Sequence, residues 1–182
     1  MTPWFFGYGS LVNRATHSYP EAQVATLHGW RRVWVRTALR EVVFLSIHPA
    51  AGHSIHGLIA SVPNADWGAL DLRESGYARI NATPHVSHDA PASSIAAYQV
   101  PADRQRHGGD HCILLSYLDV VVQGFVREFG EDGARAFFDT TDGWDTPVVD
   151  DRAAPRYSRA QSLTAQERAL TDDLLAQVQQ RQ

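Results

Sequence analysis

The chain has 182 residues, enough for one domain with a sizeable hydrophobic core. Hydrophobic residues make up 44% of it and charged residues 20%, a balance that fits a folded chain and excludes a disordered one. The formal net charge of −4 at pH 7 favours neither a nucleic acid nor a membrane as partner. All sixteen cationic side chains are arginine, which excludes a Schiff-base or other catalytic lysine. We expect a single domain over residues 1–182.

The single cysteine and the lack of a long apolar run favour a cytoplasmic location. Cys112 is the only cysteine and has no partner for an internal disulfide, which is compatible with a reducing compartment. The first six residues show no basic stretch followed by a long apolar one, so we do not interpret them as a secretory signal. No apolar run approaches the roughly 20 residues that a transmembrane helix needs.

The first half of the chain is predicted to form strands. Aromatic and β-branched residues between glycines and prolines indicate strands at residues 4–6, 24–35, 41–48, 54–62, 78–83 and 94–100, with a loop over 84–92. Gly29 interrupts the second of these strands, and Pro49 and Gly52 separate the third from the fourth. A short helix is expected to begin at Pro63 and to end near Gly76.

Helical periodicity dominates the second half. Apolar side chains recur at helical spacing over residues 113–129, a helix that Gly130 is expected to end. A shorter helix is predicted at 133–138 and an amphipathic one at 164–180, where Thr164 and Glu167 have capping-box spacing. The apolar faces of the long helices are expected to cover a sheet rather than to form a dimer. Residues 139–159 are interpreted as an ordered surface loop. Strands followed by helices predict an α+β fold.

A glycine-rich loop, Phe6-Gly7-Tyr8-Gly9-Ser10-Leu11, follows the first predicted strand. Its two glycines allow backbone conformations that other residues avoid, and they let amide groups approach a ligand closely. Such a nest, with the Ser10 hydroxyl beside it, suits a carboxylate. A tight turn that only reverses the chain explains the same pattern. A dinucleotide fingerprint fits worse, because a third glycine and an immediately following helix are missing.

An acidic segment, Asp71-Leu72-Arg73-Glu74-Ser75-Gly76-Tyr77, lies near the end of the predicted short helix. A solvated helix face with a surface ion pair is the usual role of such a cluster. A carboxylate at a helix end beside an aromatic ring can also lose contact with water, which raises its pKa toward the range of a general base. Glu74 is therefore the candidate general base.

Taken together and in this order, the two segments resemble those of the γ-glutamylcyclotransferase superfamily, in its ChaC-like and AIG2-like forms. The glycine loop is closer to the ChaC-type version than to the Tyr-Gly-Ser-Asn version. Gly29-Trp30-Arg31-Arg32 resembles the Gly-aromatic-x-Arg strand of the family, and residues 70–77 resemble the segment with the catalytic glutamate. Three later segments are similar to a bacterial subgroup rather than to ChaC itself, at residues 116–119, 140–144 and 151–157.

The resemblance implies a compact mixed β-barrel flanked by helices and a reaction without a cofactor. A γ-glutamyl compound (glutathione, a γ-glutamyl amino acid or a γ-glutamyl amine) would cyclise to 5-oxoproline and release an amine. Glu74 would act as general base, and the loop Gly7-Tyr8-Gly9-Ser10-Leu11 would cradle the substrate. Tyr77 and Tyr117 are expected to line the pocket, although buried structural tyrosines explain them equally well. Arg40-Glu41-Val42 replaces the Arg-Gly-x-Pro element of ChaC proteins, so the resemblance does not single out glutathione.

Other hypotheses fit parts of the sequence. Nine histidines invite a metal site, but no acidic or cysteine partner recurs at fixed spacing, so we expect structural or exposed histidines and no metal. A serine hydrolase would use Ser10, yet the loop is not a Gly-x-Ser-x-Gly elbow. A non-catalytic binding module of the same fold would have no use for a buried base. The basic run Arg152, Arg156 and Arg159 is expected to be a solvated face, with capture of an acidic substrate tail as the alternative.

Overall fold

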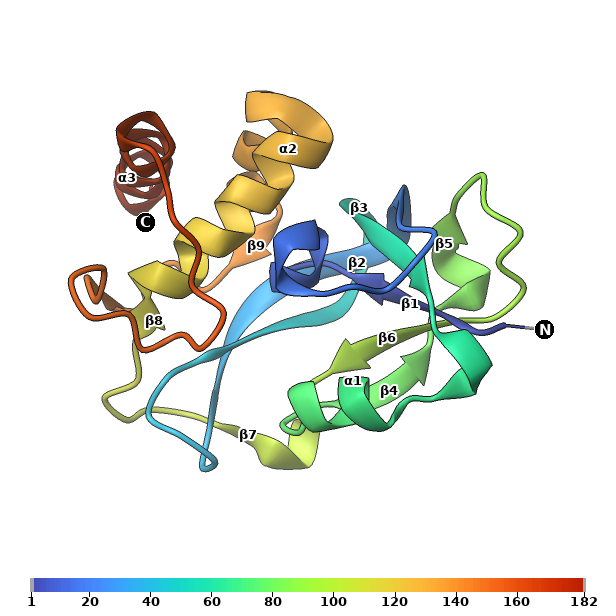
Figure 1. Cartoon of the computed structure of the whole chain (residues 1–182). Helices are drawn as coiled ribbons and strands as arrows, with labels where there is room; N and C mark the ends of the chain where they lie inside the picture. The colour runs from blue at the N-terminus through green and yellow to red at the C-terminus, as the bar shows by residue number, and fades with distance from the viewer. Residues whose placement is uncertain (1, 182) are drawn as a thin grey trace.

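An eight-stranded mixed sheet forms the centre of the computed structural model, which describes residues 2–181. Its strand order is β4-β6-β1-β3-β2-β5, and β7 and β9 also pair with β2. The sheet curls into an open half-barrel (Figure 1). The strands are β1 (Trp4–Gly7), β2 (Gln23–Thr37), β3 (Phe44–Ser61), β4 (Ala78–Asn81), β5 (Val86–Ser87), β6 (Ile95–Gln99), β7 (Gln105–Arg106) and β9 (Thr141–Asp142).

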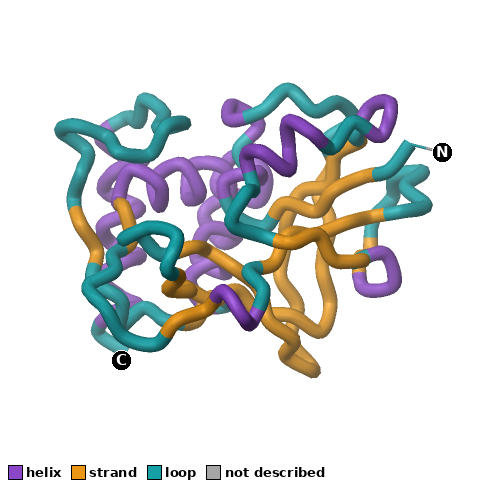
Figure 2. The backbone as a smooth tube through the Cα atoms, turned by 90° about the horizontal axis from the view of Figure 1, so that it is seen from below, coloured by secondary structure: helices purple, strands orange, loops and turns teal. Residues whose placement is uncertain are grey.

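Within residues 2–181, three α-helices flank the sheet. α2 (Leu115–Asp139) and α3 (Ala165–Gln179) lie together on one side, and the short α1 (Gly68–Arg73) lies near β4 and β6 at the other end (Figures 1 and 2). β8 (Ile113–Leu114) and β10 (Val148–Val149) form a separate two-stranded parallel sheet. In the chain, β8 lies directly before α2 and β10 follows β9. The predicted α+β fold, a mixed barrel flanked by helices, is confirmed. No helix within residues 2–181 is long and apolar enough to cross a membrane.

β2 and β3 form one long hairpin, so the prediction of separate strands at 41–48 and 54–62 is wrong. Trp30 pairs with Pro49 and His28 pairs with Ser54, which leaves residues 50–53 opposite Gly29 alone. The chain breakers therefore mark an irregularity inside one ladder rather than its end. They are tolerated because pairing with β2 resumes on both sides of them.

The helix signals of the sequence correspond to features of the backbone. Gly130 has φ 71° and ψ −175° and breaks the helical geometry inside α2, close to the predicted boundary. The capping box is confirmed: the Glu167 amide donates to Thr164 Oγ1 at 3.1 Å, and the Thr164 amide donates to Glu167 Oε2 at 2.7 Å. α1 ends at Arg73, so Glu74 occupies the C-cap position.

The segment over 139–159 is not only a surface loop, which corrects the sequence interpretation. Trp144 is 2% exposed and stacks on Phe138 with 4.7 Å between ring centroids. β9 adds to the edge of the central sheet, and β10 pairs with β8. Apolar packing of the indole therefore holds this segment against the core.

Candidate active site

One cavity lies where the end of β1, the end of α1 and the start of α2 meet. The glycine loop forms one wall and continues into a 3-10 turn, η1 (Ser10–Val12). Glu74, Tyr77 and Tyr117 form other walls, so every residue predicted to be in the site lines the same cavity. The full lining comprises Phe6, Gly7, Tyr8, Gly9, Ser10, Leu11, Leu45, Glu74, Tyr77, Tyr98 and Tyr117. The structure thus brings the two motifs together.

The carboxylate of Glu74 is shielded from water. Its side chain is 15% exposed, and its Oε1 lies 3.2 Å from Arg73 Nε. Burial raises the pKa of Glu74 above its ordinary value of 4.5, although Arg73, Arg159 and Arg40 act in the opposite direction. The group is consequently easier to protonate than an exposed glutamate, as a proton acceptor must be.

Arg73 connects α1 to the glycine loop, a role that sequence reasoning missed. Its side chain is 8% exposed and donates to Ser10 Oγ at 3.1 Å and to the Thr16 carbonyl at 2.8 Å. The hypothesis of a solvated helix face is therefore wrong for Arg73 and Glu74, whereas Leu72 between them is 79% exposed. Arg73 fixes the distance between the carboxylate and the loop.

Buried and half-buried tyrosines line the cavity around the carboxylate. The Tyr8 hydroxyl donates to the Tyr98 carbonyl at 2.5 Å, and the Tyr77 hydroxyl donates to the Leu45 carbonyl at 2.9 Å. Burial raises the pKa of Tyr8, Tyr77 and Tyr117 above the ordinary value of 10, so all three are neutral at pH 7. Tyr98 was not predicted from the sequence; its hydroxyl donates to Asp71 Oδ1 at 2.6 Å.

Arg32 holds the backbone of the glycine loop from the protein interior. Its guanidinium is fully buried between the rings of Phe125 and Phe137, 4.9 and 5.1 Å from their centroids. Arg32 Nε donates to the Tyr8 carbonyl at 2.7 Å, and other donors of the group reach Thr140 Oγ1 at 2.8 Å and the His56 carbonyl. Burial lowers the pKa of Arg32 to about 9, which leaves it charged at neutral pH.

Residues 3–111, more than half of the chain, match the family described as ChaC-like protein. The chain belongs to the ChaC-like family. The match includes the glycine loop, Arg32 and Glu74, and it ends before α2, so Tyr117 comes from outside it. No curated protein matches the sequence.

Solved structures show the same fold as this ChaC-like chain. A gamma-glutamyl cyclotransferase superposes with a TM-score of 0.60 at 13% identity, over 95% of this chain and 99% of its own. An uncharacterized protein from Homo sapiens superposes with a TM-score of 0.59 at 14% identity, over 94% of this chain and 98% of its own. YkqA from Bacillus subtilis superposes with a TM-score of 0.59 at 16% identity, over 78% of this chain and 56% of its own. At these identities the similarity establishes the fold.

In this ChaC-like chain the glycines of the loop serve both an unusual backbone conformation and close packing. Gly9 has φ −132° and ψ −124°, outside the helical and extended regions, as the sequence predicts. A Cβ at Gly9 would lie 2.8 Å from the Tyr117 hydroxyl and 2.9 Å from Leu45 Cδ2. Only glycine therefore lets the loop approach both side chains.

Gly9→Ala is expected to displace the loop from Tyr117 and to lower kcat/KM for the substrate by roughly 10- to 100-fold. Overpacking of this kind also costs about 1–3 kcal/mol of stability. Activity assays with thermal unfolding check both effects. Gly68→Ala is the matched control, because a Cβ there meets only the Asp66 side chain at 3.2 Å. Unchanged kcat/KM and unfolding temperature in Gly9→Ala would contradict the close packing of the loop against Tyr117 and Leu45.

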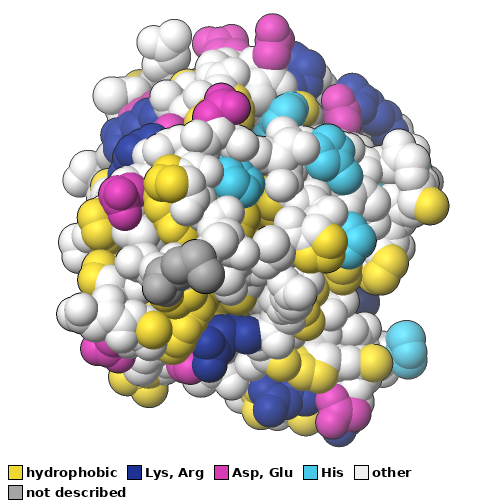
Figure 3. Space-filling view, turned by 90° about the vertical axis from the view of Figure 1, so that its right-hand side faces the viewer, with side chains coloured by type: hydrophobic (Ala, Val, Ile, Leu, Met, Phe, Trp, Pro, Cys, Tyr) yellow, Lys and Arg dark blue, Asp and Glu magenta, His cyan; other side chains and the backbone are white. Residues whose placement is uncertain are grey.

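The histidines do not gather around a common point. Several lie separately on the face of the molecule shown in Figure 3. Within residues 2–181 no group of three or more His, Cys, Asp or Glu side chains is arranged to hold a metal ion. His28 instead contacts Ser54 and Ser87 hydroxyls at 2.9 and 2.8 Å.

Proposed function

We propose that this ChaC-like chain is a γ-glutamylcyclotransferase, which converts a γ-glutamyl compound into 5-oxoproline and a free amine. The observation that carries the proposal is the shielded Glu74 carboxylate, with its raised pKa, in one cavity with the glycine loop. Membership of the ChaC-like family supports it. So does the shared fold with a gamma-glutamyl cyclotransferase, as an analogy of architecture.

Glu74 has two proton transfers to perform in this reaction. The α-amino group of the γ-glutamyl unit must attack its own γ-carbonyl carbon, and near neutral pH that amine carries an extra proton. Glu74 takes that extra proton, which frees the lone pair of the nitrogen to form the C–N bond of the lactam. Glu74 then gives this proton to the leaving nitrogen as the original amide bond breaks, so the carboxylate is regenerated. The second proton, which the attacking nitrogen loses on becoming the lactam N–H, goes to the released amine, which leaves protonated.

The glycine loop would hold the substrate for this attack. Amide groups at the start of a helical turn have no partner within the turn, and those of the loop up to Leu11 are the donors we propose for the α-carboxylate or the developing oxyanion. Arg73 ties Ser10 to Glu74, so both ends of the γ-glutamyl unit are held in fixed relation. The neutral hydroxyls of Tyr77 and Tyr117 complete the wall.

The serine-hydrolase alternative lacks a base at the nucleophile. Ser10 Oγ accepts a hydrogen bond from Arg73 Nη2 at 3.1 Å, and a guanidinium cannot remove its proton. The nearby histidine, His17, instead places Nε2 3.0 Å from the Leu11 carbonyl, and burial lowers its pKa. The contacts of Ser10 thus favour a positioning role over nucleophilic attack.

The test is 5-oxoproline formation from γ-glutamyl compounds, measured by mass spectrometry over a range of pH. Below its pKa, Glu74 is protonated and cannot accept a proton. We therefore expect kcat/KM to fall on acidification with a midpoint above 4.5, because burial raises this pKa. Ligand binding without any product would instead support the binding module. A covalent acyl adduct on Ser10 would support the hydrolase.

A further inference from the structure

A wider outer cavity adjoins the inner one and shares Ser10, Glu74, Tyr77 and Tyr117 with it. Because the glycine loop lies on the inner side, the γ-glutamyl unit would fill the inner cavity. The amine portion of the substrate would then extend outward. The residues of the outer cavity therefore face the part of the substrate that the reaction releases.

The outer cavity is rich in arginine. Arg40, Arg156 and Arg159 line it together with Arg73, whereas Glu74 is its one acidic residue among those described. Arg73 is already paired with Glu74. Within residues 2–181 the other three arginines take part in no ion pair. Three guanidinium groups without a carboxylate in direct contact thus surround the space for the amine portion.

Arg156 and Arg159 belong to a segment that is held firmly against α2. This segment, residues 151–159, is called the strap. The buried carboxylate of Asp151 accepts hydrogen bonds from the Ser116 amide at 2.8 Å, the Ser116 hydroxyl at 2.6 Å and the Arg156 amide at 2.9 Å. Tyr157 then packs edge-on against Tyr117, 5.0 Å between centroids. The strap backbone is consequently fixed beside the cavity.

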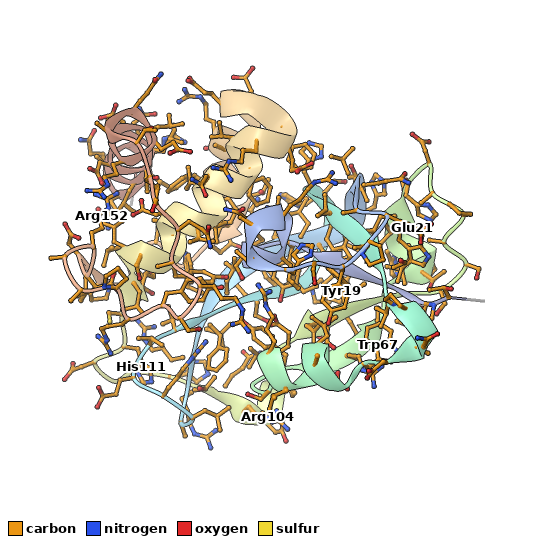
Figure 4. The ribbon with its side chains drawn as sticks, viewed as in Figure 1. Tyr19, Glu21, Trp67, Arg104, His111 and Arg152 are labelled. Carbon is orange, nitrogen blue, oxygen red and sulfur yellow. The ribbon has the colours of Figure 1, made fainter. Side chains whose placement is uncertain are left out.

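Arg152 has a different task, which corrects the prediction of one solvated basic run. Its guanidinium contacts both Asp119 oxygens at 2.7 Å and Asp172 of α3 at 2.9 Å, and Figure 4 shows it beside α3. Arg152 therefore anchors the strap, whereas half-buried Arg159 remains available to a ligand. Arg40 reaches the cavity from the loop before β3, its guanidinium 3.7 Å from the centroid of the Phe44 ring.

We propose that Arg40, Arg156 and Arg159 bind an anionic group on the amine portion of the substrate, so that the enzyme selects γ-glutamyl compounds whose released amine carries a negative charge. This inference rests on the proposed function. Arg40 and Arg159 line the same outer cavity as Glu74, and their positive charges lower the pKa of its carboxyl. Arg156 and Arg159 lie outside the residues that match the ChaC-like family, so two of the three selecting groups come from this chain's own C-terminal part, whereas Arg40 lies within the match.

Three substrates of nearly equal size test the proposal: γ-glutamylglycine, γ-glutamylglycinamide and the γ-glutamyl amide of ethylenediamine. Within the substrate, the portion to be released carries a carboxylate, no charge and an ammonium group, respectively. We expect kcat/KM to be at least ~10-fold higher for the anionic than for the neutral compound, and lowest for the cationic one. Raising the salt concentration should reduce the ratio, because the arginines are partly exposed to solvent.

Arg159→Gln and, separately, Arg156→Gln are expected to bring the anionic-to-neutral ratio closer to one, mainly through a higher KM for the anionic compound. Arg104→Gln is the matched control: it makes the same charge change at an exposed residue near β7 (Figure 4), and the ratio should be retained. A wild-type ratio near one, or a full ratio in both variants, would overturn the inference while 5-oxoproline formation still upheld the reaction. Absence of 5-oxoproline from all three compounds would instead refute the proposed function, and the inference with it.

Discussion

Replacing Glu74 by glutamine is expected to lower kcat for 5-oxoproline release by roughly 10²–10⁴-fold, the usual contribution of a general base. Glutamine has nearly the same shape, and its amide oxygen can still accept from Arg73 Nε, now 3.2 Å from the carboxylate. It cannot take a proton from the attacking amine. The substitution therefore separates proton transfer from the geometry of the cavity.

The stability of Glu74→Gln distinguishes loss of the base from loss of the fold. The raised pKa means that the folded protein holds this proton more tightly than the unfolded chain does. Ionisation of Glu74 therefore lowers stability at pH values above the raised pKa, and this cost vanishes below the ordinary value of 4.5. Because the shift already includes the attraction of Arg73, we expect a Tm at pH 7 no lower than that of the wild type.

Glu128→Gln is the control for this variant. Glu128 is also ion-paired with an arginine, Arg14 at 2.6 Å, and its side chain is 13% exposed, but it lies outside both cavities. The activity of Glu128→Gln should stay within a few-fold of that of the wild type. Full activity of Glu74→Gln would remove Glu74 from the mechanism. A large fall in its Tm would assign the loss of activity to the fold.

The core of the candidate site was predictable because each motif is contiguous in sequence. The glycine loop and the acidic segment each combine a turn with a functional group, and such local patterns survive without knowledge of the fold. Arg73 was not predictable, because an arginine between acidic neighbours is typical of solvated helices. Only the tertiary approach of Thr16 and Ser10 buries it. Tyr98 reaches the cavity because β6 pairs with β1, a long-range contact that leaves no local signal.

The strand boundaries failed for a related reason. Gly29, Pro49 and Gly52 are breakers by local propensity, yet pairing with the partner strand resumes beyond them and β3 continues. Trp144 shows the converse. The sequence around it has no helical or strand periodicity that predicts a core residue, but its indole stacks on Phe138 in the folded chain. Local propensity describes what a segment prefers alone, and tertiary partners decide the result where that preference is weak.

Arg32→Met is expected to destabilise the fold more than any surface substitution. Methionine fills much of the space between Phe125 and Phe137 but donates no hydrogen bond. It leaves the buried carbonyl oxygen of Tyr8 and the partly buried one of His56 without the partner they have now. At about 1–3 kcal/mol for each unsatisfied group, we expect a loss of roughly 2–6 kcal/mol, measured by urea unfolding. The glycine loop loses its support at Tyr8, so kcat/KM should fall as well.

Arg31→Met is the matched control, because adjacent residues of a strand face opposite sides of the sheet. Arg31 pairs with Asp142 at 2.8 Å, and that carboxylate is 41% exposed, so the loss should be about 1 kcal/mol or less. Arg32→Lys keeps the charge but cannot span three acceptors as a planar guanidinium does, and it should fall between the two. If Arg32→Met unfolded at the same urea concentration as Arg31→Met, the buried guanidinium would not be what holds the loop in place. The cradle proposed for the substrate would then owe its shape to the packing of Leu11 and Tyr8 alone.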